Sequence, residues 1–163
     1  MRLSVNLNKI ALIRNSRGND NPSLLDYAKK CIDLGVDGIT LHPRPDHRHA
    51  TSKDAINISE ICKNNNIEFN LEGNPFSLPD GDFIGFQELC AQALPSQVTL
   101  VPDDLLQITS DHGWQPGYRE MELKEFLNSV KDFCPRTSLF IDANIDSVEY
   151  AGQMGFDRIE INT

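Results

Sequence analysis

The chain has 163 residues, a formal net charge of −9 and 39% hydrophobic residues. This length is sufficient for one domain with a core of its own, and no apolar run approaches the roughly 20 residues that a membrane span needs. Because nucleic acids and membrane surfaces are polyanionic, a strongly negative chain is not expected to bind them in a general way.

Short apolar runs alternate with amphipathic stretches along the whole chain. The expected strands are residues 3–7, 38–41, 68–71, 97–101, 137–141 and 158–161. The stretches with helical spacing of apolar residues lie within 24–32, 55–62, 83–93, 123–133 and 145–151. Repeated strand–helix units predict a parallel sheet, either doubly wound or closed as a (β/α)8 barrel.

The expected strands carry polar residues at every second position. Asn6, Thr40, Asn70 and Glu160 each alternate with apolar neighbours. The strands of a doubly wound sheet are covered on both faces and should be apolar throughout. The interior of a (β/α)8 barrel, in contrast, holds an active site at its C-terminal mouth. The alternation therefore favours the barrel.

The number of expected strands indicates how much of a barrel the chain covers. Six expected strands are fewer than the eight of a complete barrel, which typically needs about 250 residues. We therefore expect residues 1–163 to form a single α/β domain that covers about strands 1–6 of a TIM (β/α)8 barrel and is incomplete at its C-terminal end.

The segment 42–49 reads HPRPDHRH and directly follows the second expected strand. Its two prolines hold it extended, and its histidines and arginines indicate an anion-binding, proton-transferring site. His42 and Glu72 end neighbouring strands on the same face, so they are candidates for general acid–base work. Arg17 and Arg44 suit a phosphate or carboxylate group. The structural alternatives are a carboxylate paired with an arginine and arginines on a solvated surface.

A long segment of about twenty residues follows the fourth expected strand, from 101 to 120. Such a length is typical of a lid over an active site. Trp114, next to Gly113 and close to Pro116-Gly117, is expected to lie in a flexible frame within it.

Cofactor signals are weak in this sequence. The pair His47-x-His49 resembles the start of a metal site in some barrel hydrolases. Such sites need further histidines on later strands, and the one later histidine, His112, falls in a loop, so we expect no metal. No nucleotide-binding glycine motif is present. The cysteines form no CxxC pair and are expected to be buried free thiols in a reducing cytosol; they are Cys31, Cys62, Cys90 and Cys134.

Several motifs, in order along the chain, carry a family resemblance. They are VNLNKIALIRNSRG (5–18), GVDGITLHPRPDHRHA (35–50), FNLEG (69–73), VTLVPD (98–103), ITSDHGW (108–114), TSLFIDA (137–143) and DRIEI (157–161). Together they resemble the pyridoxine 5′-phosphate synthase family of the deoxyxylulose-dependent vitamin B6 pathway.

The resemblance implies a cytoplasmic (β/α)8-barrel enzyme that assembles as a homo-octamer. Its two small phosphorylated substrates would be 1-deoxy-D-xylulose 5-phosphate and 3-amino-2-oxopropyl phosphate. Their condensation closes the pyridine ring and releases phosphate and water, with no organic cofactor and no catalytic metal.

The resemblance also assigns roles to individual residues. His42 and Glu72 would be proton acceptors, and Glu160 would stabilise charge in the transition state. The residues implied to bind the amino-ketone phosphate are Asn6 and Arg17. Those implied to bind the deoxyxylulose phosphate are Asn8, Lys9, Arg44, His49 and Thr109.

Two departures from the family pattern matter. Some members carry Asp-His where this chain has Asn8-Lys9, which indicates a subtype. The family's third catalytic histidine and its glycine-rich phosphate loops would lie beyond Thr163. We therefore expect residues 1–163 alone to be inactive and poorly stable.

Two other functions remain open at this point. The chain could be a truncated, non-catalytic phosphate-binding barrel, or part of another phosphate-binding barrel enzyme such as an isomerase or a lyase. An aldolase-type lyase would need a Schiff-base lysine on a strand, and Lys9, just past the first strand, is the nearest candidate.

Overall fold

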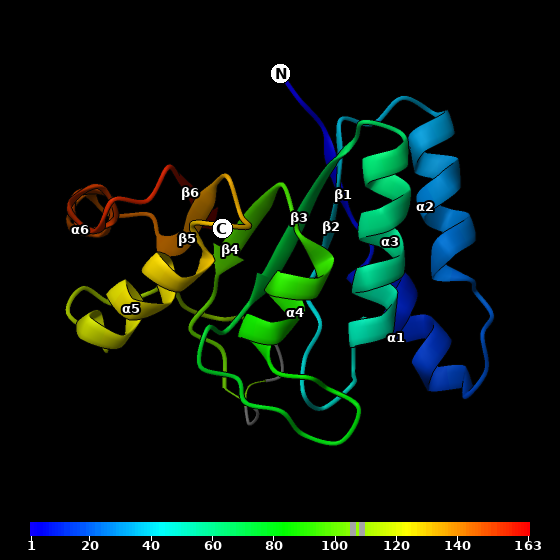
Figure 1. The fold of residues 1–163 in the computed structure, drawn as a ribbon, viewed down its shortest axis with the longest axis horizontal. Coiled ribbons are helices and arrows are strands. Elements are labelled where there is room, and N and C mark those ends of the chain that lie inside the picture. Colours follow the sequence, from blue (N-terminus) through cyan, green and yellow to red (C-terminus); the bar gives the residue numbers. More distant parts are fainter. Residues whose placement is uncertain (105–106, 108–109) are drawn as a thin grey trace.

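The computed structural model describes residues 1–104, 107 and 110–163. In this part of the chain, six parallel strands pair in chain order. The strands are β1 (Ser4–Asn6), β2 (Gly38–Leu41), β3 (Glu68–Gly73), β4 (Gln97–Leu100), β5 (Thr137–Asp142) and β6 (Arg158–Asn162). The helices are α1 (Asn8–Arg17), α2 (Leu24–Asp33), α3 (Ser52–Asn64), α4 (Phe86–Ala93), α5 (Glu120–Val130) and α6 (Ile145–Met154). Figure 1 shows these elements in their order along the chain.

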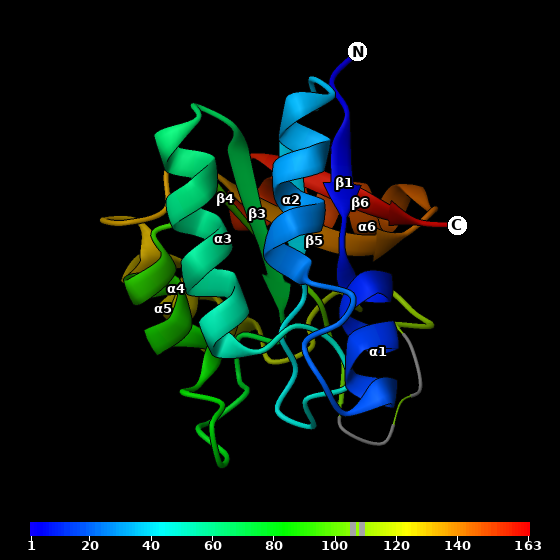
Figure 2. The same cartoon turned by 90° about the vertical axis from the view of Figure 1, so that its right-hand side faces the viewer.

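Helix α1 directly follows β1, where the sequence patterns predict a loop (Figure 2). The backbone N–H of Asn8 donates to Oδ1 of Asn6 at 2.9 Å, and this contact helps the chain turn into the helix. The helix ends at Gly18, whose φ of 63° is the left-handed conformation that glycine adopts without strain. Helical spacing misses α1 because its apolar residues, 10–13, are contiguous. Arg17 therefore lies on a helix and not in a loop.

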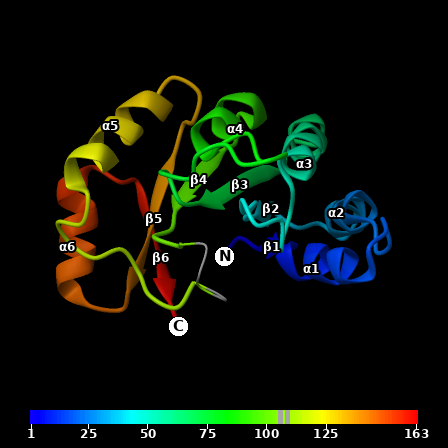
Figure 3. The same cartoon turned by 90° about the horizontal axis from the view of Figure 1, so that it is seen from below.

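The sheet curls so that the helices lie on its convex side, as the view from below shows (Figure 3). The side chains that point outward are apolar, and many of them are fully buried against the helices; they include Ile39, Leu41, Phe69, Leu71, Val98 and Leu100. A doubly wound sheet would have helices on both faces. The architecture is that of a curled half-barrel, consistent with part of a TIM barrel.

The concave face of the sheet is polar, as the alternation in the sequence predicts. The parallel register aligns Asn6 with Thr40, Thr40 with Asn70, and Asn70 with Gln97. Side chains alternate between the two faces of a strand, so these residues share the inner face. Asn70 accepts hydrogen bonds there from Thr99 at 3.0 Å and from Gln97 at 3.1 Å.

All four cysteines are free. Cys62, Cys90 and Cys134 are buried, as expected, whereas Cys31 is half-buried. Burial raises the pKa of the Cys62 thiol to about 12, so this thiol stays protonated and unreactive at neutral pH. Among the described residues, none of the helices has both the length and the apolar character that a membrane crossing requires.

The segment between β4 and α5 is fixed at its C-terminal end, in contrast to the flexible frame expected around Trp114. The Trp114 side chain is fully buried, and its ring lies 5.9 Å from the rings of both Phe76 and Tyr118. Its backbone N–H donates to the carbonyl of Phe140 at 2.8 Å. This part of the segment therefore packs onto β5.

Gly113 tests how tightly the segment packs. A Cβ atom at this position would lie 2.2–2.5 Å from backbone atoms of Ile141 and Asp142. We expect Gly113→Ala to lower the free energy of unfolding by about 1–3 kcal/mol or more, because backbone must move. The matched control is Gly152→Ala in α6, where nothing lies within 4 Å and a gain of about 0.5–1 kcal/mol is expected. Urea unfolding that gives both variants the same stability would contradict the close contact.

Candidate active site

A cavity of about 400 Å³ runs along the concave face of the sheet. Strands from both halves of the sheet contribute to it, and their side chains are mostly polar or charged. The lining includes Ser4, Asn6, Thr40, Asn70, Glu72, Ser138 and Glu160. The cavity therefore combines hydrogen-bonding groups with four carboxyl groups. Those of Asp37 and Glu68 are engaged with Leu3, Arg2 and Arg136, which leaves Glu72 and Glu160 as the two candidates for proton transfer.

Glu72, near the end of β3, is the more deeply buried of these carboxyl groups, with 8% of its surface exposed. The side-chain amides of Asn6 and Asn70 donate to its two oxygens, each at 3.4 Å. Burial, and then the charges of Glu160 and Asp103, raise the pKa of Glu72 well above its ordinary value. The two long hydrogen bonds do not offset the cost of burying a charged carboxylate, so the protonated form of Glu72 is favoured.

Glu160, on β6, lines the same cavity and is half-buried. Burial raises its pKa as well. Because the charge of Glu160 disfavours ionisation of Glu72, proton release from one of these groups affects the other. Such a pair can both give and accept a proton, which is the property required of an acid–base catalyst.

His42 directly follows β2, and the pairing of Leu41 with Leu71 places it level with Glu72 on the next strand. Its backbone N–H donates to Oδ1 of Asn8 at 2.8 Å. Burial, Arg44 and His49 lower the pKa of the imidazole to about 3. His42 is therefore neutral at physiological pH, and one of its two ring nitrogens carries a lone pair.

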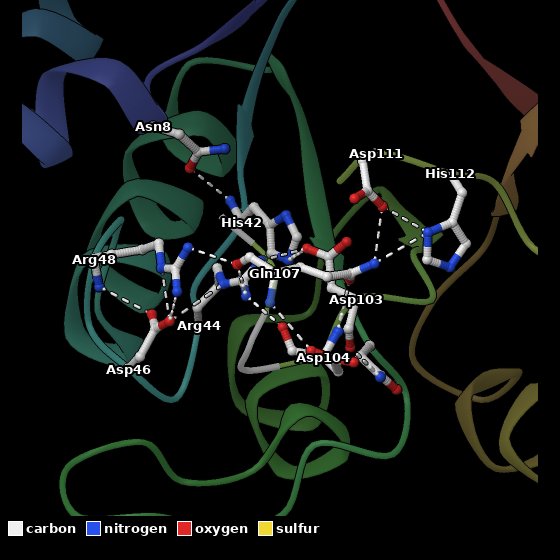
Figure 4. A network of polar contacts seen from close by, with 11 residues as sticks. Asn8, His42, Arg44, Asp46, Arg48, Asp103, Asp104, Gln107, Asp111 and His112 are labelled. Carbon is white, nitrogen blue, oxygen red and sulfur yellow. Dashed lines mark hydrogen bonds and ion pairs between the residues drawn. The ribbon is translucent and has the colours of Figure 1, made fainter. Parts of the chain in front are cut away.

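Arg44 joins the β2 loop to the segment after β4, as Figure 4 shows. Its Nη1 donates to Oδ2 of Asp103 at 2.6 Å. Its Nη2 donates to the backbone carbonyls of Asp104 at 2.7 Å and Gln107 at 3.3 Å. The guanidinium is almost fully buried, so its orientation is fixed.

The other predicted site residues are placed unevenly. Asn8 is buried, and its oxygen is engaged with the backbone of His42. His49 is half-buried, with its ring 6.1 Å from that of His42. Lys9 and Arg17 are exposed on α1. Thr109 lies outside the described residues.

The two histidines of the His47-x-His49 pair face different environments. His47 lines a cavity of about 760 Å³ between α1, α2 and α3, whereas His49 faces His42. Within the described ranges, no group of three or more His, Cys, Asp or Glu residues is arranged to hold a metal ion.

Two residues of the site were not singled out from the sequence. Asp103 follows β4 as His42 follows β2, so its position at a strand end was an available signal. Asn15 carries no such signal: its side-chain amide donates to the carbonyls of His47 and His49, each at 2.7 Å. It thereby holds the loop that carries the histidines against α1.

Comparison with known proteins adds a family assignment. The family model described as "Pyridoxal phosphate biosynthesis protein PdxJ" matches residues 3–163. A pyridoxine 5′-phosphate synthase of Xanthomonas axonopodis pv. citri is 46% identical over 162 residues, covering 99% of this chain and 64% of the relative. The synthase of Xylella fastidiosa (strain M12) is also 46% identical, with 99% and 62% covered. That of Xanthomonas oryzae pv. oryzae (strain MAFF 311018) is 44% identical, with 100% and 64% covered.

The chain thus spans 62–64% of the length of these relatives. Among solved structures, a D-psicose 3-epimerase crystallised in the presence of D-fructose superposes with a TM-score of 0.45 at 13% identity, over 83% of this chain and 56% of that chain. This likeness is too remote to bear on function.

The raised pKa of Glu72 predicts a pH-dependent stability. A carboxyl group whose pKa is raised in the folded state stabilises the fold fully below its ordinary value of 4.5, and this contribution is lost as the pH rises through the folded pKa. Glu72→Gln removes the titration, so we expect it to be more stable than the wild type at pH 8. The difference should shrink by about 1.4 kcal/mol for each pH unit below the folded pKa.

Urea unfolding at several pH values between 4.5 and 8 measures this difference. The exposed Glu125 provides the matched control, since Glu125→Gln should show no such trend. A Glu72→Gln variant with a pH-independent stability difference would contradict a buried, protonated Glu72.

Proposed function

Since the chain belongs to the PdxJ family of pyridoxal phosphate biosynthesis proteins, we propose that its protein is a pyridoxine 5′-phosphate synthase. The reaction would be the condensation of 1-deoxy-D-xylulose 5-phosphate with 3-amino-2-oxopropyl phosphate, which closes the pyridine ring and releases phosphate and water. The observation that carries the proposal is that Glu72 and Glu160 line one cavity of the concave face, with buried His42 level with Glu72 at the end of the neighbouring strand.

The deoxyxylulose phosphate would bind near the end of β2. Arg44 and His49 lie beside His42 there, and the positive charge of the guanidinium would attract a phosphate. Asn8 and Lys9 at the start of α1 complete this proposed set, together with Thr109. Burial, and then the charges of Arg44 and Arg48, lower the pKa of His49, and Lys9 adds a smaller effect in the same direction. This gathering of cations around His49 supports a shared anion site.

The amino-ketone phosphate would be bound by Asn6 and Arg17. Asn6 supports this assignment, since its amide already donates to Glu72 in the cavity. The assignment of Arg17, which is exposed at the end of α1, comes from the family resemblance alone.

The carboxyl pair suits the first chemical step. The substrate ammonium would give a proton to an ionised carboxylate of Glu72 or Glu160, because a carboxylate with a raised pKa is a stronger base than an ordinary one. The free amine then attacks the ketone, and the same proton returns to the hydroxyl that leaves as water. Neutral His42 would accept protons in the later steps that form the ring. A cavity shielded from bulk water would protect the imine from hydrolysis.

The remaining parts of the proposal come from the family resemblance alone. The enzyme would act in the cytoplasm as a homo-octamer, without an organic cofactor or a catalytic metal. That residues 1–163 are inactive by themselves also stays a prediction. For the alternative of an aldolase-type lyase, Lys9 is poorly placed, because it is exposed on α1 and not inside the sheet.

Formation of pyridoxine 5′-phosphate from the two substrates by the full-length protein tests the function. We expect Glu72→Gln to lower kcat by about 10²–10⁴-fold, the usual contribution of a general acid–base group. Glu125→Gln on the exposed face of α5 should keep wild-type turnover. Absence of product with the wild type, or normal turnover by Glu72→Gln, would contradict the proposal.

A further inference from the structure

Asp103 follows β4 directly after Val101 and Pro102, and its carboxylate meets two residues of the β2 loop. Its Oδ2 accepts a hydrogen bond from Nη1 of Arg44 at 2.6 Å and lies 3.6 Å from Nε2 of His42. The three side chains are only 3–7% exposed. A single oxygen atom therefore faces both the cation proposed to bind phosphate and the base proposed to accept a proton (Figure 4).

Asp103 supplies the short ion pair among the groups that hold the guanidinium of Arg44. Backbone carbonyls of Asp104 and Gln107 take hydrogen bonds from Nη2, while Nε lies 3.7 Å from a carboxylate oxygen of Asp46. Asp103, at 2.6 Å, lies closer to the guanidinium than Asp46, at 3.7 Å. A buried ion pair adds little net stability compared with apolar residues of similar size, so what this pair provides is a fixed geometry.

Several charged groups face His42. Arg44 and His49 disfavour its protonation, and Asp46 favours it. Glu72 lies level with it on β3. The carboxylate of Asp103 is the acidic group recorded within ion-pair distance of the imidazole, so an imidazolium formed during the reaction would have its counter-charge at 3.6 Å.

We propose that Asp103 is a positioning residue of this site, which orients Arg44 toward the substrate phosphate and supplies the counter-charge for the His42 imidazolium. This inference rests on the proposed function for the roles of Arg44 and His42. It adds a residue on a third loop, after β4, that couples phosphate binding to proton transfer.

Three variants separate the two effects of Asp103. Asp103→Asn keeps an acceptor for Arg44 but removes the charge, so kcat should fall roughly tenfold or more while KM for deoxyxylulose phosphate changes less than about threefold. Asp103→Ala removes both, so KM should also rise about tenfold. Asp103→Glu restores the charge and should recover at least about a third of wild-type kcat.

The matched control is Asp82→Asn in the neighbouring β3–α4 loop, which makes the same change of charge at an exposed position and should leave kcat and KM unchanged. A merely structural role of Asp103 would reduce the yield of folded enzyme without splitting kcat from KM. Wild-type kcat in Asp103→Asn would overturn the proposal, as would an Asp103→Glu variant no better than Asp103→Ala.

A second measurement does not depend on turnover. Calorimetric binding of inorganic phosphate should be weakened about tenfold in Asp103→Ala and little changed in Asp103→Asn. Tighter binding in both variants would mean that Asp103 competes with phosphate for Arg44, and this would overturn the proposal. If the wild type forms no pyridoxine 5′-phosphate but phosphate binds in this pattern, the proposed function fails while the orienting role of Asp103 stands.

Discussion

Removal of the Glu72 carboxyl group from water is the interaction on which the candidate site depends. An ionised carboxylate loses its hydration in the concave cavity, and two hydrogen bonds of 3.4 Å replace it poorly. The group therefore keeps a proton that it would release in water. This state follows from the curl of the sheet, since a flat sheet would leave the same face open to solvent.

The loops around the cavity are tied together by side chains that also shape the backbone. Asn6, at the end of β1, accepts a hydrogen bond from the first backbone N–H of α1 and donates one from its amide to Glu72. Asn8 then holds the backbone of His42. Where the loop after β2 enters α3, Thr51 and Asp54 cap the helix by reciprocal hydrogen bonds. Asp54 also forms an ion pair with Arg14 of α1. The same few contacts thus fix the course of the backbone around the cavity and the placement of the candidate catalytic side chains.

The sequence predicts the part of this fold that periodicity controls. The six strands and their polar inner face follow from alternation along each strand, because one face must meet apolar helices. Helix α1 was missed because its apolar residues form no stripe, and the burial of Trp114 was missed because it depends on contacts with Phe76 and the backbone of Phe140. For the site, His42 and Glu72 could be found from strand ends. Asp103 also follows a strand end, but its role becomes visible only through its contact with Arg44.

The most direct test of the account is a crystal structure of the full-length protein with 1-deoxy-D-xylulose 5-phosphate bound. We predict that the phosphate contacts Arg44 and His49 and that the rest of the molecule extends along the concave face toward Glu72. Binding in the outer cavity between α1, α2 and α3, with the concave face free of substrate, would contradict the assignment of the polar inner face as the active site.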